Sequence, residues 1–210
     1  MMARAAKPSG RKRPSFDTAL TRKAGHRESK QRLLVVCGAE VTERDYLQGL
    51  KSSARNSAVS VKIAEHPKSP SQVVDRAEFL RDQADGEYDE VWCVLDVDEF
   101  PNLGQVVAEA RKKNIEVAFS NPCFEVWLLL HFTEYRRPAR SFRELLPVLE
   151  RTFPAGYEKT GVKFDHYEPH WRLAASRAKQ LAEPGSEHET NPSTGVWKLA
   201  LAIGGGQAGS

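Results

Sequence analysis

The chain has 210 residues and a formal net charge of +3 at pH 7, which is enough length for one α/β domain with a small appendage. Its three cysteines are widely spaced and form no C-x-x-C pair, which argues against a zinc ribbon and against a disulfide framework. The sequence contains no apolar run of membrane length and no signal-peptide core, so we expect a cytoplasmic protein without a membrane partner.

Positive charge is concentrated at the N-terminus, where the first 32 residues hold ten Lys and Arg against two acids. Residues 1–31 lack apolar periodicity and cannot bury enough surface to offset the entropy of ordering, so we expect a disordered basic arm. Its cluster of Arg11, Lys12 and Arg13 would bind nucleic acid through counterion release, although a solubilising tail explains the composition equally well. Residues 204–210 are rich in Gly and are expected to be a flexible tail.

Short apolar runs alternate with helical periodicity up to residue 119. The predicted strands are Leu33–Cys37, Val59–Ala64, Val91–Asp96 and Ile115–Phe119. The predicted helices run from Glu43 to about Ala54 with Thr42 as N-cap, from Ser69-Pro70 with Val73, Val74, Ala77, Phe79 and Leu80 inward, and over Leu103–Asn114. This order predicts an α/β fold with a mainly parallel sheet flanked by helices, whose sites form at the carboxyl ends of the strands.

The second half of the chain is predicted to be helical. A buried helix is expected after Pro122, and further helices are expected near Ser141–Leu149, Pro169–Ala182 and Thr194–Leu201. Asn191-Pro192-Ser193-Thr194 is interpreted as the turn and cap that begin the last helix. His131, at the end of the first of these helices, is expected to interact with the negative end of the helix dipole. Cys37 and Cys93 lie in apolar runs and are interpreted as small buried hydrophobic residues.

Asp96 and Asp98 terminate the most apolar strand of the chain. They are two residues apart, so on an extended backbone their side chains point the same way. A carboxylate at the end of a buried strand is poorly solvated and is tolerated when a cation neutralises it. The pair can hold a hard divalent cation such as Mg²⁺, whereas a surface turn with acids facing water is the competing interpretation.

Other candidate residues carry weaker signals. Asn121 and Glu125 stand at the carboxyl end of the fourth predicted strand, where Glu125 either faces a site or caps a helical turn. Lys159 and Lys163 lie beside Tyr157 and Phe164, a combination that can bind phosphates and stack on bases. A solvated surface explains these lysines as well.

Three separated motifs resemble the RloB-like family. The first is Val36-Cys37-Gly38-Ala39-Glu40-Val41-Thr42-Glu43-Arg44-Asp45-Tyr46, which resembles its C-E-G-x-x-T-E-x-x-Y. The second is Asp96-Val97-Asp98-Glu99-Phe100, which resembles its D-x-D-x-F, and the third is residues 120–132, which resemble its S-N-P-x-F-E-x-W-L-L-L-H-F. With Tyr157-x-Lys159 and residues 191–194, the resemblance covers roughly residues 32–203. The family resembles Toprim domains and is linked to prokaryotic phage-defence and restriction loci, often beside an AAA-type ATPase.

The resemblance implies a nuclease that uses Mg²⁺ or Mn²⁺, with Glu43, Asp96 and Asp98 as metal ligands. One departure bears on catalysis: the family's first Glu falls on Gly38, and Glu40 could replace it from a shifted loop. Two alternatives remain open at this point. One is a nucleic-acid or ATPase-partner binding module that has lost catalysis, and the other is a nucleotidyl-transferring Toprim enzyme.

Overall fold

The computed structural model describes residues 30–39, 41–54, 58–97, 100, 102–153, 157–158 and 162–205. Several sequence candidates lie outside these residues: Arg11, Lys12, Arg13, Glu40, Asp98 and Lys159. The predictions made for them therefore remain predictions. The described residues form the strands and helices of an α/β domain.

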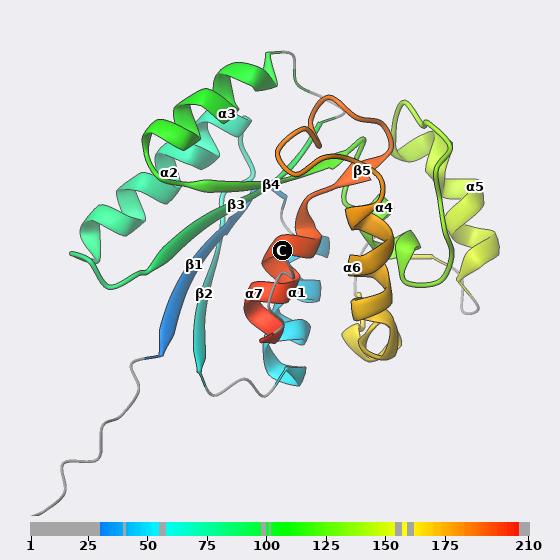
Figure 1. Cartoon of the computed structure of the whole chain (residues 1–210), viewed down its shortest axis with the longest axis horizontal. Helices are drawn as coiled ribbons and strands as arrows, with labels where there is room; N and C mark the ends of the chain where they lie inside the picture. The colour runs from blue at the N-terminus through cyan, green and yellow to red at the C-terminus, as the bar shows by residue number, and fades with distance from the viewer. Residues whose placement is uncertain are drawn as a thin grey trace, which may run out of the picture.

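Five strands form one sheet in the order β2-β1-β3-β4-β5 (Figure 1). They are β1 (Gln31–Cys37), β2 (Val59–Glu65), β3 (Glu90–Asp96), β4 (Glu116–Asn121) and β5 (Ser193–Thr194). The first four pair in parallel, and β5 pairs antiparallel with β4 at the edge. The predicted α/β class with a mainly parallel sheet is therefore confirmed. The first strand begins two residues earlier than the apolar run predicts, because Gln31 and Arg32 are exposed and polar yet still pair with β2.

Helices cover both faces of the sheet. In Figure 1, α2 (Pro70–Gln83) and α3 (Leu103–Lys112) lie above it, and α1 (Thr42–Ser53) and α7 (Val196–Gly204) lie below it. Alternate strand residues enter the two cores: Leu33 and Val35 join the α1 side, whereas Leu34 and Val36 join the α2 side. Burial on both faces explains why these strands appear in the sequence as continuous apolar runs.

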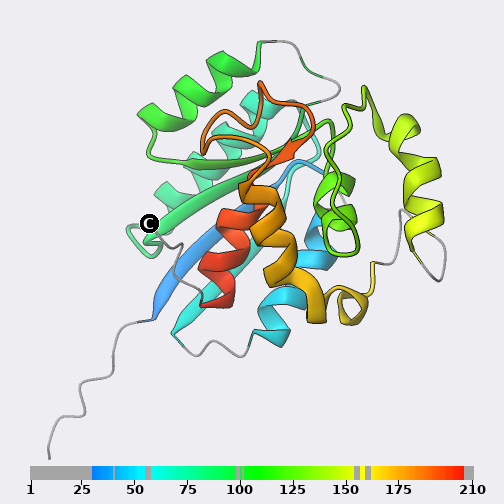
Figure 2. The same cartoon turned by 45° about the vertical axis from the view of Figure 1, so that its right-hand side comes forward.

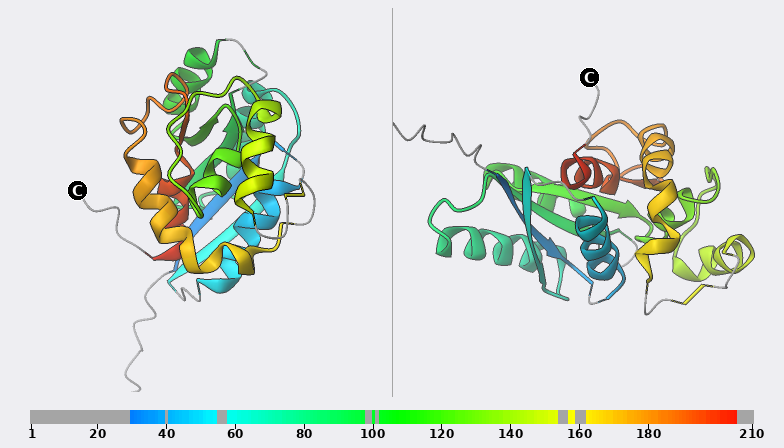
Figure 3. Two further views of the ribbon diagram at one scale, coloured as in Figure 1. Left: turned by 90° about the vertical axis from the view of Figure 1, so that its right-hand side faces the viewer. Right: turned by 90° about the horizontal axis from the view of Figure 1, so that it is seen from below.

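The helical second half extends the core on the α1 side. It contains α4 (Glu125–Leu130), α5 (Phe142–Thr152) and α6 (Trp171–Lys179), with two short 3₁₀ helices, Phe164–His166 and Glu168–His170, before α6. In Figures 1 and 3, α5 stands at the end of the molecule toward which the parallel strands point. The second half therefore lies next to the carboxyl edge of the sheet, where sites in parallel sheets form.

The N-cap of α1 and one residue of α2 differ from their predictions. Val41, not Thr42, is the N-cap of α1, so the predicted cap was wrong by one residue. Val73, Val74 and Ala77 are buried on α2 as predicted. Phe79 is 49 % exposed and the prediction that it faces inward was wrong, because it lies only two positions after Ala77 and so turns away from the buried stripe. The guanidinium of Arg76 lies 5.2 Å from the centre of the Phe79 ring.

His131 is a core residue at the C-cap of α4, where it interacts with the C-terminal end of the helix as predicted, but as a neutral hydrogen-bond donor and not as a charge. The side chain is 1 % exposed, and burial lowers its pKa to about 3, so the imidazole is neutral at pH 7. Nδ1 lies 2.9 Å from the Trp127 carbonyl oxygen, and Nε2 lies 2.9 Å from the Tyr46 hydroxyl. Because a carbonyl only accepts, Nδ1 carries the proton and Nε2 accepts a hydrogen bond from Tyr46.

Residues 191–194 do not form the turn that begins the last helix. Ser193 and Thr194 form β5, and α7 starts after the N-cap Gly195. The Val196 N–H donates to the Thr194 hydroxyl at 3.3 Å, but Thr194 precedes the N-cap, so the prediction that it caps the helix was wrong. A two-residue strand is too short to be recognised from its own sequence, because its pairing depends on the neighbouring β4.

Candidate functional site

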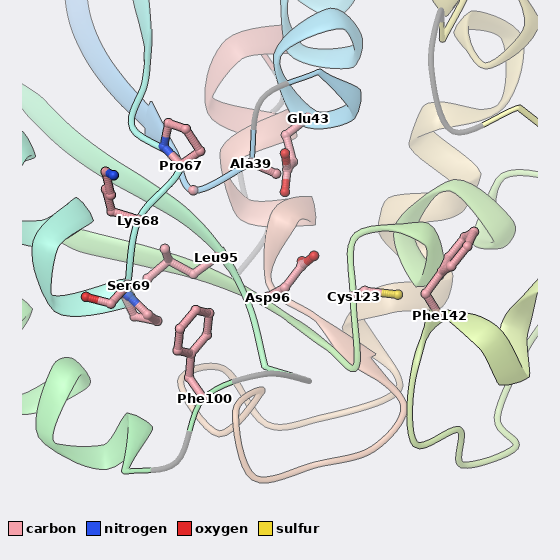
Figure 4. A pocket seen from close by; sticks show the side chains of 12 residues that line it. Ala39, Glu43, Pro67, Lys68, Ser69, Leu95, Asp96, Phe100, Cys123 and Phe142 are labelled. Carbon is pink, nitrogen blue, oxygen red and sulfur yellow. The ribbon is translucent and has the colours of Figure 1, made fainter.

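A pocket of about 480 Å³ opens at the carboxyl edge of the sheet (Figure 4). The ends of β1 and β3, the start of α1 and the β2–α2 connection meet there, as expected for parallel strands. Residues from five segments line it: Gly38, Ala39, Glu43, Pro67, Lys68, Ser69, Pro70, Leu95, Asp96, Phe100, Cys123 and Phe142. The pocket therefore brings together parts of the first and third family-like motifs and the start of the second.

Glu43 enters the pocket from the first turn of α1. Its side chain is 1 % exposed and its Oε2 atom is buried. The positive end of the helix dipole favours a carboxylate at this position, but only by about 0.3–1 kcal/mol. A divalent cation bound in the pocket would add to that stabilisation of the buried carboxylate.

Asp96 enters the same pocket from the last residue of β3. It pairs with Ser120 of β4, and its Oδ1 atom is buried. The next residue, Val97, is held by N–H donation to the Ser120 and Pro122 carbonyl oxygens at 3.1 and 3.0 Å. Figure 4 shows the Glu43 and Asp96 carboxylates pointing into the same space from opposite walls. Two carboxylates that come from different elements thus face one cavity.

Oxygen donors of this kind suit Mg²⁺ or Mn²⁺. Mg²⁺ is usually held by one or two carboxylates, with waters and substrate phosphates completing its shell. Glu43 and Asp96 fit that donor set. Within the described part of the chain, no group of three or more His, Cys, Asp or Glu side chains is placed to hold a metal ion. Asp98 and Glu40, the other predicted ligand and proton acceptor, lie outside the described residues.

Gly38 forms part of the pocket wall where the family pattern has Glu. A Cβ atom built on it would lie 3.0 Å from Leu95 Cδ2 and 3.2 Å from the Val94 carbonyl oxygen. The Gly38 N–H donates to that same carbonyl at 2.9 Å, which fixes the backbone close to β3. Close approach between two strands, rather than an unusual backbone angle, is therefore what Gly38 permits here.

Asn121 and Glu125 lie beyond the Cys123 wall and do not line the pocket. Asn121 ends β4, and its Oδ1 accepts a 2.9 Å hydrogen bond from Asn191. Glu125 begins α4, is 2 % exposed and accepts a 2.7 Å hydrogen bond from the Tyr157 hydroxyl. Burial and the negative charge of Glu125 raise the pKa of Tyr157, so the phenol keeps its proton. The hydrogen bonds of both side chains are therefore made to residues that do not line the pocket.

Of the two predicted nucleic-acid lysines, Lys163 is described, is exposed and does not line the pocket. The thiols of Cys37 and Cys93 are buried, and burial raises the pKa of both, for Cys93 to about 12. The charge of Glu43 adds to this effect at Cys37. Both thiols therefore remain protonated, in agreement with their interpretation as small buried residues.

Sequence reasoning did not single out Lys68, Cys123 or Phe142 as pocket residues. For Lys68 a signal was present, because it follows β2 at the same carboxyl edge as Asp96. Phe142 starts α5, whose position depends on packing between distant segments, and nothing in its local sequence indicates a pocket. In Figure 4, Lys68 and Phe142 mark opposite sides of the opening.

The fold and the site define a class: an α/β protein whose parallel sheet ends in a pocket with two facing carboxylates. The family model described as RloB-like protein matches residues 33–203. The chain therefore belongs to the RloB-like family, as the motifs of the sequence indicate. Comparison with curated proteins gave no match, and comparison with solved structures gave none. No helix within the described ranges is long and apolar enough to cross a membrane.

Proposed function

We propose that this protein is a metal-dependent nuclease of the Toprim kind that acts in prokaryotic defence against phage. The observation that carries the proposal is the pairing of Glu43 and Asp96 in one pocket at the carboxyl edge of the sheet. The membership in the RloB-like family supports it, because the family's motifs supply these two acids. The reaction would be hydrolysis of a phosphodiester bond.

In this proposal Glu43 and Asp96 hold Mg²⁺ or Mn²⁺, and Asp98 adds a third carboxylate from the same motif. When bound, such an ion lowers the pKa of a coordinated water and offsets charge on the phosphate. Lys68 lines the pocket and would hold a non-bridging phosphate oxygen by its ammonium group. Glu40 would accept the proton of the attacking water, the task that the family's first Glu would otherwise perform.

The proposed substrate is nucleic acid, and the proposed partner is an AAA-type ATPase. The positive N-terminal arm with Arg11, Lys12 and Arg13 supports a polyanionic substrate, as does the placement of Lys159 and Lys163 beside aromatic residues. The partner rests on the family resemblance alone. An ATPase would supply energy for moving or opening the nucleic acid, a task for which the sequence holds no phosphate-binding P-loop.

A binding module without catalysis is the second candidate, and Gly38 is the observation that favours it. The position offers no carboxylate, and its close contact with Val94 leaves little room for one. With only two acids facing the described pocket, metal could be bound without enough groups to move a proton.

The two candidates are separated by a cleavage assay on single-stranded DNA, duplex DNA and RNA with Mg²⁺ or Mn²⁺. Asp96→Asn and Glu43→Gln should each lower the cleavage rate by about a hundredfold or more. Removing one group that stabilises a transition state typically has an effect of this size. Glu116→Gln is the matched control, because Glu116 is an exposed acid at the opposite end of β4. Cleavage that survives both pocket substitutions would refute the nuclease proposal.

Metal binding by itself gives a second readout. Isothermal titration with Mn²⁺ should show binding by wild type and by Glu116→Gln, and strongly weakened binding by Asp96→Asn. If wild type binds Mn²⁺ but cuts none of the three substrates with the partner ATPase present, the binding module is the better description. If Asp96→Asn binds as tightly as wild type, the assigned metal site is wrong.

A further inference from the structure

A short basic segment leads into the first residues of α5 and was not recognised in the sequence as a candidate site. Residues 136–143, here called the arginine loop, contain Arg136, Arg137, Arg140 and Arg143 and no acidic residue. All four arginines are exposed. Four guanidinium groups within eight residues create a strong local positive potential, and guanidinium groups bind phosphate oxygens in a bidentate manner.

The backbone of the arginine loop is fixed to the edge of the sheet. Ala139 is 2 % exposed, its N–H donates to Asn191 Oδ1 at 3.0 Å, and its carbonyl accepts from Asn191 Nδ2 at 2.7 Å. The same Nδ2 group donates to Oδ1 of Asn121, the last residue of β4. A loop held in this way has its backbone fixed at Ala139, which reduces the backbone entropy lost when a ligand binds.

The arginine loop ends at the rim of the pocket. Phe142 lines the pocket and lies between Arg140 and Arg143 in the sequence. In Figure 2, α5 and the segment before it stand at the edge of the molecule, and Figure 4 places Phe142 on the side of the opening away from Lys68. The loop therefore leads from the outer surface to the pocket.

The hydrogen-bond partners of the arginine loop do not neutralise the positive charge of its guanidinium groups. Arg136 donates from Nη2 to the neutral amide oxygen of Gln180 at 2.9 Å. The carboxylate of Glu144 accepts the backbone N–H of Arg140 at 2.9 Å, and so acts at the start of α5. The pocket itself is negative because of Glu43 and Asp96, which repel a polyanion. Cations at its rim offset that repulsion and raise the local concentration of a polyanionic ligand.

We propose that the arginine loop binds the phosphate backbone of the nucleic-acid strand that reaches the pocket. Arg140 and Arg143 flank the rim and contact the phosphates nearest to the pocket, whereas Arg136 and Arg137 contact phosphates further along the strand. The contact is with the backbone and is therefore independent of base sequence. That the bound nucleic-acid strand leads into the pocket rests on the proposed function, whereas the binding of its phosphates by the arginine loop does not.

The test is the binding of short fluorescein-labelled strands, followed by fluorescence anisotropy in EDTA so that no cleavage occurs. Wild-type protein is compared with the Arg140→Gln/Arg143→Gln variant and with a variant that carries all four Arg→Gln changes. The control is Arg111→Gln/Lys112→Gln, two exposed cations at the far end of α3. Single-stranded DNA, duplex DNA and RNA are measured separately, from about 50 to about 200 mM NaCl. Circular dichroism verifies that each variant is folded.

The fourfold variant should bind about tenfold more weakly or worse at the lowest salt, and its salt slope should fall by about 0.9 per lost contact on duplex DNA or about 0.7 on a single strand. The control should bind like wild type. Equal losses in control and loop variants, or no binding by wild type, would overturn the inference. If the loop variants lose binding while neither wild type nor any variant cleaves nucleic acid in Mg²⁺, the arginine loop binds nucleic acid as proposed and the nuclease proposal is rejected.

Discussion

The hydroxyl of Tyr157 donates a 2.7 Å hydrogen bond to Oε1 of Glu125, 32 residues earlier in the chain. Glu125 is 2 % exposed at the start of α4, and the ring of Tyr157 lies 5.9 Å from that of Phe142, a residue of the pocket wall. The pair therefore connects the carboxyl end of β4, through α4, with the start of α5.

Replacing Tyr157 by Phe should lower the free energy of unfolding by about 1–3 kcal/mol, because a buried carboxylate loses its donor while the ring is retained. Urea denaturation measures the change. Tyr135→Phe is the control, since Tyr135 is a half-buried tyrosine packed against the same core. A Tyr157→Phe loss no larger than the control's would show that the hydrogen bond contributes little.

Acid should destabilise the protein through His131. Its pKa is lowered to about 3, mainly by burial, with the charges of His170 and Arg177 adding to the effect. In the unfolded chain His131 has an ordinary pKa near 6.5, so between about pH 6.5 and pH 3 only the unfolded state binds the proton. Stability from this residue is present above about pH 6.5 and falls by about 1.4 kcal/mol for each pH unit below it.

The measurement is the unfolding free energy as a function of pH for wild type, His131→Gln and His166→Gln. His166 is an exposed histidine and serves as the control. His131→Gln should have a shallower acid slope than wild type, whereas His166→Gln should not change it. Parallel slopes for wild type and His131→Gln would contradict the assignment of a neutral buried imidazole.

The sheet could be predicted from the sequence because its central strands are buried on both faces. Leu33–Cys37 and Val91–Leu95 are short continuous apolar runs, the form that strands covered on two sides take. The parallel pairing of these strands then places Glu43 and Asp96 at one edge, because the carboxyl ends of parallel strands meet there. This part of the candidate site follows from local pattern and topology alone.

The remaining part of the site depends on contacts between distant segments. Tyr157 reaches Glu125, and Asn191 reaches both Ala139 and Asn121, across long stretches of chain. Such pairs leave no repeating pattern in the sequence, because each buried polar group needs only one partner and that partner can come from any part of the chain. The same reason explains why the sequence did not indicate the hydrogen bond between His131 and Tyr46, since the two side chains come together only in the fold.

A buried ion pair at the end of the chain gives a further prediction. Glu187 is 3 % exposed, and its Oε1 lies 2.8 Å from Nζ of Lys198 in an ion pair that departs from ideal hydrogen-bond angles. Its Oε2 accepts the Gly185 N–H at 2.7 Å. Lys198→Met should cost about 3 kcal/mol or more, because it leaves a carboxylate uncompensated in the interior.

Glu187→Gln/Lys198→Met should recover part of that loss, since the double variant removes both charges. Chemical denaturation of wild type, both single variants and the double variant yields the coupling free energy. Additive losses, with no recovery in the double variant, would show that the two side chains do not interact.

The last prediction concerns Gly38, where the family pattern has Glu. Any side chain at this position meets Leu95 Cδ2 at 3.0 Å and the Val94 carbonyl oxygen at 3.2 Å, and the backbone atom cannot move without disturbing β3. Gly38→Ala and Gly38→Glu should therefore lose stability to a similar extent, by about 1–3 kcal/mol, as in other overpacked sites. Gly38→Ala serves as the matched control, because it adds the Cβ atom without a carboxylate.

Only Gly38→Glu should change the metal site. Gly38 lines the pocket that holds Glu43 and Asp96, so a carboxylate there adds a hard oxygen donor to the same cavity. Its Mn²⁺ affinity should exceed that of Gly38→Ala by about tenfold, which corresponds to about 1.4 kcal/mol. Isothermal titration of both variants measures the difference, and thermal unfolding measures the shared loss of stability. If Gly38→Glu binds Mn²⁺ no more tightly than Gly38→Ala, the side chain at position 38 does not reach the metal, and its absence cannot explain a loss of catalysis.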